Sequence, residues 1–148
     1  MGLALRAAEV ADAAFLTDVV IETTRDQGRL SRDFDEDAFR RLYEQWSATQ
    51  VDTTSVIEVD GVPAGRLRVV RTPEAIELSG LQLLPAYQGI GIGRLLLEGL
   101  KHEARERRTP IELSVETDNP RAQAFYEREG FTFVTATDDE RVYRWSSA

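Results

Sequence analysis

The chain has 148 residues and a mass of 16.6 kDa, the size of one compact domain, so we expect residues 1–148 to form a single domain. Hydrophobic residues make up 42% and charged residues 30%, which is ordinary globular usage and excludes a disordered or fibrous chain. The formal net charge of -8 argues against a nucleic acid or an anionic membrane as partner and mildly favours cationic ones.

The residue types that are missing exclude further classes. There is no cysteine, which removes disulfides, thiolate metal sites and a cysteine nucleophile together. Without clustered histidines or a known carboxylate loop we expect no metal, and the lone His102 is expected on the surface. The first residues lack the pattern of a signal peptide, and the richest apolar stretch, Ile90 to Leu100, is interrupted by Arg94 and Glu98. We therefore expect a cytoplasmic protein without a membrane partner.

The chain opens with a short strand and two helices. Leu3 to Ala7 suits a strand, and Ala11 to about Asp26 has helical spacing, with Gly28 as a stop. Ala14, Phe15 and Val19 carry this helical spacing. A second amphipathic helix is expected over Glu36 to Gln50, with an apolar face of Phe39, Leu42, Tyr43 and Trp46.

A meander of three strands follows. Thr53 to Val59 and Val62 to Arg71 are β-branched runs joined by an Asp60-Gly61 turn, which predicts a hairpin, and Ala75 to Leu84 adds the third strand. Beyond it we expect these elements: a helix over Gly91 to about Arg107, a strand over Ile111 to Val115, a helix over Asn119 to Arg128, and a hairpin of Phe131 to Thr137 with Arg141 to Trp145. This order predicts a mixed α/β sheet covered by helices.

Glycines connect the third strand of the meander directly to the strongest helix, in the segment Gln88-Gly-Ile-Gly-Ile-Gly93. A glycine turn at a helix N-terminus presents unpaired N–H groups and the positive end of the helix dipole, which suits a phosphate or pyrophosphate. The alternative is a tight connection without a ligand. The spacing G-x-G-x-G matches neither the dinucleotide fingerprint nor the P-loop.

Two segments carry a family resemblance. Gln88, Gly91 and Gly93 match the Q/R-x-x-G-x-G/A acetyl-CoA signature of the GNAT superfamily of N-acetyltransferases. The segment Asn119-Pro-Arg-Ala-Gln-Ala-Phe-Tyr126, followed by Glu-Arg-Glu-Gly-Phe131, resembles the family's N-x-x-A-x-x-F-Y-x-x-x-G-F segment. The expected element order is also that of the GNAT fold, in which parallel fourth and fifth strands splay into a cleft for the pantetheine arm.

The resemblance implies acetyl-CoA as co-substrate and transfer of its acetyl group to an amine, by direct attack in a ternary complex. The oxyanion would be bound by the backbone N–H of Leu83 or Leu84. The loop and the first helical residues would cradle the pyrophosphate; this set is Gln88, Gly89, Ile90, Gly91, Gly93 and Arg94. Asn119 would cap its helix, bind the cofactor, or do both.

Two side chains match the family's acid and base. Tyr126 corresponds to the tyrosine that gives a proton to the leaving thiolate; the alternative is core packing. Glu77 resembles the general base of the histone acetyltransferase branch, acting directly or through water. Its alternative is an exposed strand carboxylate that faces solvent or pairs with Arg68. Many family members use no fixed base at all.

The acceptor is the least determined part. Phe34, Tyr43, Trp46 and the charged stretch Arg25 to Asp37 lie where the family commonly builds its acceptor pocket, although Tyr43 and Trp46 also suit a core. We expect a small-molecule primary amine, and the acidic balance favours a cationic one. The alternatives are a peptide or protein acceptor and a non-catalytic acyl-CoA sensor; the family also includes many homodimers.

Overall fold

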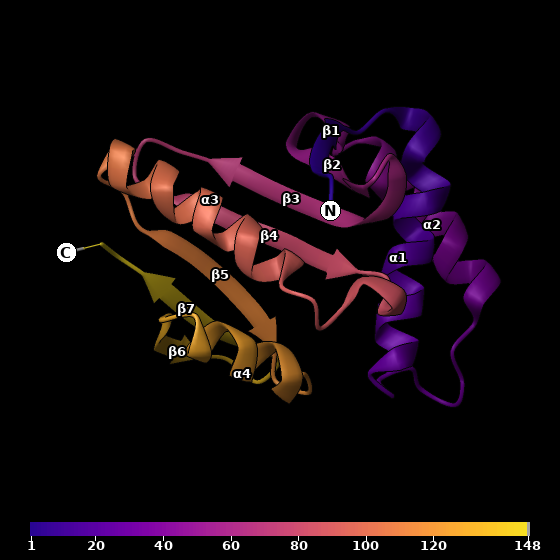
Figure 1. Ribbon diagram of the computed structural model, residues 1–148. Coiled ribbons are helices and arrows are strands. Elements are labelled where there is room, and N and C mark those ends of the chain that lie inside the picture. Colours follow the sequence, from indigo (N-terminus) through magenta and orange to yellow (C-terminus); the bar gives the residue numbers. More distant parts are fainter. Residues whose placement is uncertain (148) are drawn as a thin grey trace. The chain divides into compact units, whose positions relative to one another are not determined.

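The structure is a computed structural model that describes residues 1–147 (Figure 1). Its helices and strands are β1 Leu3–Ala7, α1 Ala13–Asp26, α2 Glu36–Ala48, β2 Thr54–Val59, β3 Val62–Arg71, β4 Ile76–Leu83, α3 Ile92–Arg107, β5 Ile111–Glu116, α4 Pro120–Arg128, β6 Thr132–Ala136 and β7 Glu140–Trp145. Short 3-10 turns lie at Val10–Asp12, Val51–Thr53 and Pro85–Tyr87. The seven strands form one sheet in the order β1-β2-β3-β4-β5-β7-β6. The expected mixed α/β architecture is confirmed.

The chain divides into two compact units, and the first comprises Met1–Arg68 and Gly80–Ile90. In it β1 pairs antiparallel with β2, and β2 pairs antiparallel with β3. The turn between β2 and β3 has positive φ at both Asp60 (52°) and Gly61 (79°), the backbone that an Asp-Gly hairpin turn requires. The predicted hairpin is therefore confirmed, with its strands starting and ending within a residue of the expected limits.

Helix α1 buries two of the three residues expected to face the core: Val19 is fully buried and Phe15 is partly buried against the core. Leu16, Val19 and Ile21 are almost fully buried, whereas Ala14 is exposed. The expectation was wrong for Ala14 alone, because this small residue fits either side of a helix, whereas burial of Leu16 and Ile21 removes more apolar surface from water. The register of α1 is thus set by its larger aliphatic side chains.

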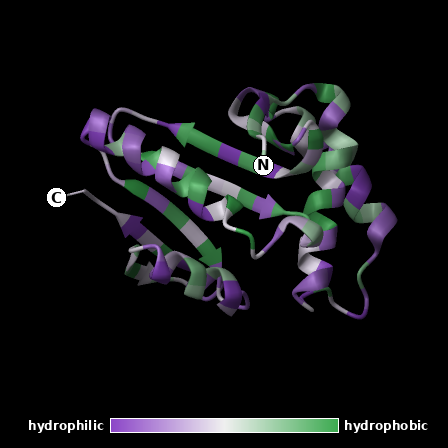
Figure 2. Ribbon diagram, viewed as in Figure 1, coloured by the Kyte–Doolittle hydropathy of each residue, from purple (hydrophilic) through white to green (hydrophobic). Residues whose placement is uncertain are grey.

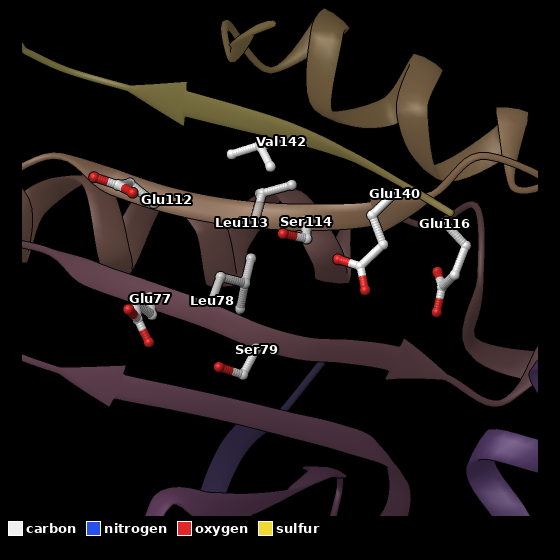
Figure 3. Close-up of a pocket in the computed structure, with 9 residues that line it drawn as sticks. All are labelled: Glu77, Leu78, Ser79, Glu112, Leu113, Ser114, Glu116, Glu140 and Val142. Atoms are coloured by element: carbon white, nitrogen blue, oxygen red, sulfur yellow. The ribbon is translucent and has the colours of Figure 1, made fainter. Parts of the chain in front are cut away.

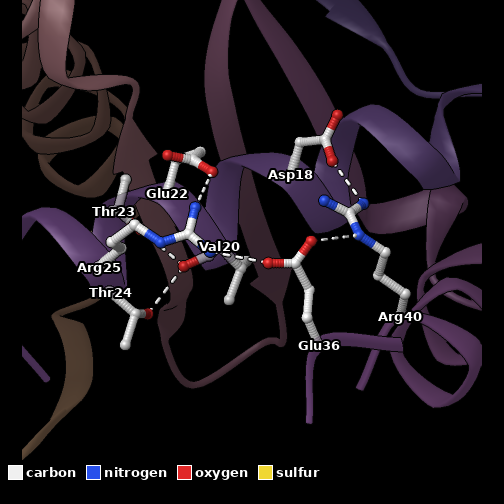
Figure 4. Close-up of polar contacts among 8 residues, drawn as sticks. All are labelled: Asp18, Val20, Glu22, Thr23, Thr24, Arg25, Glu36 and Arg40. Carbon is white, nitrogen blue, oxygen red and sulfur yellow. Dashed lines mark hydrogen bonds and ion pairs between the residues drawn. The ribbon is translucent and has the colours of Figure 1, made fainter. Parts of the chain in front are cut away.

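Arginine bridges join α1 to α2 (Figure 4). Arg25 donates to the Glu36 carboxylate at 2.7 Å, and Arg40 approaches the same carboxylate at 3.3 Å while it also pairs with Asp18. Asp35 caps α2 by accepting from the backbone of Ala38. These contacts hold the amino-terminal half of α2 against α1.

A row of aromatic rings lies along α2. Phe39 stacks on Tyr43 with centroids 5.2 Å apart, and Tyr43 meets Trp46 at 5.1 Å. Leu42, which was expected on the apolar face, is 71% exposed. That expectation was wrong because α2 packs mainly on α1, which leaves no partner for the side of the helix that bears Leu42.

The second unit comprises Val69–Ser79 and the chain from Gly91 onward. Its strands β5 and β7 pair antiparallel, as do β6 and β7, so the predicted final hairpin is confirmed. Apolar and polar residues alternate along β5 (Figure 2), and its alternate residues Ile111, Leu113 and Val115 are buried. Helix α3 buries apolar residues spaced three and four apart, namely Ile92, Leu96, Leu97, Leu100 and Ala104.

The parallel pairing of β4 with β5 is short. It runs from Ile76↔Ile111 to Leu78↔Leu113, although β4 and β5 both continue beyond these residues. The next residues in register, Ser79 and Ser114, both line a pocket in this unit. The two strands are thus hydrogen-bonded at their beginnings only, among the residues that the structure describes.

Candidate functional site

The glycine turn has the backbone that its sequence predicts. Gly89 and Gly91 have φ values of 76° and 92°, in the left-handed region that favours glycine. A Cβ placed on either would meet no atom within 4 Å, so the space above both is open. Gly91 is the N-cap of α3 and caps it without a side chain, which leaves the first N–H groups of the helix for a ligand. Gly93 differs, because its Cβ would lie 3.2 Å from the Phe125 ring.

The start of the glycine turn is tied back to β4. The Gln88 side-chain amide donates to the Leu83 carbonyl at 2.8 Å. The Leu84 N–H donates to the Ala64 carbonyl of β3 at 2.9 Å and is therefore already engaged. Since N–H groups of neighbouring strand residues point to opposite sides, the Leu83 N–H points away from β3. Of the two proposed oxyanion donors, Leu83 is the one whose N–H is not used by β3.

Tyr126 lies in α4 and is only 8% exposed. Its ring meets Phe125 and Phe131 edge to face, with centroids 5.1 and 5.5 Å away. Burial raises the pKa of the Tyr126 phenol well above its ordinary value, and the Glu116 carboxylate raises it further. The phenol is thus neutral, and it makes no hydrogen bond within residues 1–147.

Glu77 lines a pocket of about 400 Å³ on the sheet of the second unit (Figure 3). Ser79, Ser114 and Val142 also line it, and it has four carboxylates, from Glu77, Glu112, Glu116 and Glu140. Figure 3 shows Glu77 and Glu112 at one end and Glu116 with Glu140 at the other. Glu112 forms an ion pair with Arg144 at 3.5 Å.

Glu77 and Glu116 lie at different positions along the sheet. Glu77 is in register with Glu112 of β5, and Glu112 lies four residues, about 13 Å of strand, before Glu116, the carboxylate whose charge acts on Tyr126. Glu116 faces Glu140 across the β5–β7 pair. Neither Glu116 nor Glu140 was predicted from the sequence, although the alternation of β5 puts Glu112, Ser114 and Glu116 on one face.

The remaining predicted residues lie at the ends of α3 and α4. Asn119 caps α4 by accepting from the Ala122 N–H at 3.2 Å, so its capping role is confirmed. Arg94 lies in the first turn of α3, largely exposed and 3.9 Å from Glu129. His102 is exposed, as expected. Within residues 1–147 no group of three or more histidine, cysteine or acidic residues could hold a metal ion.

The fold is found in known acetyltransferases. PaiA N-acetyltransferase from Thermoplasma acidophilum, solved in complex with coenzyme A, superposes with a TM-score of 0.82 at 19% identity, over 99% of each chain. An acetyltransferase from Thermus thermophilus gives 0.76 at 21% identity, over 99% of this chain and 97% of that one. At these identities the likeness establishes the fold.

The sequence itself matches the acetyltransferase (GNAT) family over residues 18–131. The chain belongs to the GNAT family. It is 43% identical over 86 residues to N-alpha-acetyltransferase RimI of Mycobacterium tuberculosis, a match that covers 57% of this chain. The matched region spans about half (52%) of that relative's length. None of the helices in residues 1–147 is both long and apolar enough to cross a membrane.

Proposed function

We propose that the chain, acting as one domain, is an acetyl-CoA-dependent N-acetyltransferase that transfers the acetyl group to a primary amine. The observation that carries the proposal is the open glycine turn at the N-terminus of α3, in a chain of the GNAT family. The coenzyme A in the PaiA complex supports the choice of acyl donor.

The glycine turn fits the pyrophosphate of that donor. Open space above Gly89 and Gly91 lets oxygen atoms approach the backbone, and the N–H groups from Gly89 to Arg94 are donors for them. The exposed Arg94 guanidinium adds a charge-assisted contact, and Ile90 supplies only backbone. Asn119 can turn its amide nitrogen outward while its oxygen caps α4.

Three groups of the protein carry the proposed reaction: the Leu83 N–H, the Tyr126 phenol and the Glu116 carboxylate. The amine nitrogen forms a bond to the thioester carbonyl carbon, and the Leu83 N–H stabilises the oxygen as its negative charge develops. When the carbon–sulfur bond breaks, Tyr126 donates a proton or a hydrogen bond to the departing thiolate, a role that its neutral phenol allows. The products are the N-acetyl compound and the free thiol of coenzyme A.

The attacking amine must also lose a proton. We assign that proton to Glu116, because its carboxylate lines the pocket and its charge acts on the Tyr126 phenol. Glu77 lines the same pocket at the end opposite to Glu116, so we assign it a part only through ordered water. Glu116 thus accepts one proton from the amine and Tyr126 gives one proton to the thiolate; passage of the proton from Glu116 to Tyr126 returns both groups to their starting states.

The acceptor is either a small-molecule amine or the amino terminus of a peptide or protein, and a separate observation favours each class. The small-molecule amine is the class expected from the sequence, and the acidic pocket suits a cationic one. The likeness to RimI, an N-alpha-acetyltransferase, favours the amino terminus of a peptide or protein. The non-catalytic sensor differs from both, because it would bind coenzyme A without transfer.

The experiment is acetylation of two matched panels, one of small amines and diamines and one of short peptides with free amino termini, read by mass spectrometry. Acetyl-CoA must be consumed in step with the acetylated amine. Products in the peptide panel alone assign the second class. Binding of coenzyme A with no product in either panel would contradict the enzymatic proposal and favour the sensor.

A further inference from the structure

One arginine in the first unit is buried without an acidic partner. Arg66 of β3 is only 3% exposed, and its side chain makes one hydrogen bond within residues 1–147, from Nη1 to the Gln82 side-chain oxygen at 3.0 Å. The charged or titratable groups that act on it are Tyr43 and Arg68, and no carboxylate is among them. Burial lowers the pKa of Arg66, as expected for a cation without a counter-ion.

The other buried cation shows how unusual this is. Lys101 is 6% exposed, but it donates to the Glu129 carbonyl at 2.7 Å and lies 3.5 and 3.9 Å from the Glu98 and Glu129 carboxylates. The chain has 26 acidic residues for 18 basic ones, so carboxylates are not scarce. A buried guanidinium that none of them reaches is costly unless a ligand supplies the missing anion.

The backbone around Arg66 is shaped for its guanidinium. A Cβ at Gly80 of β4 would lie 2.0 Å from Arg66 Nη1, so the absence of a side chain at residue 80 lets the guanidinium lie across β4. Gln82 holds it from the same strand. The arginine is thus positioned in advance by two residues of β4, which leaves most of its N–H donors unused.

Those donors are not completely enclosed by the protein. Within residues 1–147, three side-chain polar atoms are shielded from solvent and make no hydrogen bond: Ser47 Oγ, Gln50 Oε1 and Thr109 Oγ1. No nitrogen of Arg66 is among them, so the nitrogens that do not bond Gln82 keep an opening to solvent. Tyr43, whose phenol pKa is raised by burial and lowered in part by Arg66, belongs to the half-exposed aromatic row of α2.

We propose that Arg66 binds a carboxylate of the amine acceptor. The planar guanidinium presents paired N–H donors that match the two oxygens of a carboxylate. The inference rests on the proposed acetyl transfer, and it makes Arg66 a residue that determines acceptor specificity. It also differs from the expectation based on net charge, because the acceptor then carries an anionic group beside its amine.

The test uses acceptors that differ only in the carboxylate: amino acids with their decarboxylated amines, and peptides with Glu or Gln at the second position. The wild type should prefer the acceptor that carries the carboxylate in one of the two kinds of pair, either the amino-acid pairs or the peptide pairs. Arg66→Met should raise KM for that member at least about tenfold, change its kcat little, and leave KM for the neutral partner and for acetyl-CoA unchanged. The kind of pair that shows this preference tells whether the natural acceptor is a free amino acid or an acidic peptide.

Gly80→Ala provides a second variant that retains the charge. Its methyl group must displace the flexible end of Arg66, so it should reproduce the selective rise in KM. Gly99→Ala in α3, where a Cβ meets nothing within 4 Å, is the matched control and should change no acceptor preference. Melting temperatures of all variants show whether they fold.

A binding measurement keeps this inference separate from the proposed activity. In the presence of coenzyme A, the wild type should bind the N-acetyl form of an acidic acceptor more tightly than Arg66→Met does, by calorimetry, even if no turnover is found. No turnover with Arg66-dependent binding would reject the activity and retain the anion site. The inference would be overturned if Arg66→Met weakened the binding of acidic and neutral acceptors equally, or if it changed neither. Arg66 would then be a structural residue.

Discussion

The Gln88 side chain donates a 2.8 Å hydrogen bond to the carbonyl oxygen of Leu83 and so ties the glycine turn to the end of β4. Gln88→Ala removes this bond, and we expect the affinity for coenzyme A to fall by about 1 kcal/mol, or several-fold, because the turn loses its fixed position. Calorimetric titration measures it. Gln27→Ala at the end of α1 is the control and should bind as the wild type does.

A Gly91→Ala substitution tests the left-handed N-cap of α3. The alanine Cβ disfavours a φ of 92° by about 1–2 kcal/mol, so both the melting temperature and the affinity for coenzyme A should fall. Gly99→Ala, within the same helix, should raise the melting temperature slightly, since alanine is the better helix former. Unchanged binding of coenzyme A by Gly91→Ala would show that the turn does not hold the donor.

Removal of the Tyr126 hydroxyl tests the assigned acid. Tyr126→Phe keeps the ring packed between Phe125 and Phe131, so the fold and the dissociation constant of coenzyme A should change little. The rate constant kcat should fall by about 100-fold, the usual contribution of a general acid. Steady-state kinetics beside calorimetry separate the two quantities; equal losses in both would contradict the acid role.

The same phenol predicts how stability depends on alkaline pH. The folded-state pKa of Tyr126 is raised, so the unfolded chain releases its proton first. The stabilisation is therefore present below about pH 10, the ordinary tyrosine pKa, and is lost as the pH rises above it. Tyr126→Phe should weaken this alkaline decline in denaturant unfolding, measured from pH 8 upward; an identical decline would refute it.

A pair of isosteric variants distinguishes the two candidate bases. Glu116→Gln should lower kcat by about 100-fold at neutral pH, because the amine loses its proton acceptor. Glu77→Gln, about 13 Å further along the sheet, should change it only about twofold. The reverse ranking would return the base role to Glu77, the residue chosen from the sequence.

The sequence predicted most of the fold because its elements are locally marked. The Asp60-Gly61 turn, helix α3 and the Asn119 cap each depend on signals within a few residues, and each is found where expected. The exposure of Ala14 and of Leu42 was not predictable in this way, because it depends on which surface packs against each helix.

Less of the candidate site than of the fold could be predicted from the sequence. The spacing of the motifs correctly predicted the glycine turn at the start of α3 and the position of Tyr126 in α4. The register between β4 and β5, which separates Glu77 from Glu116, arises only from strand pairing across the sheet. The isolation of Arg66 also follows from tertiary burial, since nothing adjacent in sequence marks it.

Amine-dependent thiol release from acetyl-CoA tests the central claim most directly. The account predicts release that depends on an acceptor, saturates with both substrates in a ternary complex, and largely disappears in Tyr126→Phe while coenzyme A still binds. Thiol release that no amine from either panel accelerates, with coenzyme A bound at full stoichiometry, would contradict it.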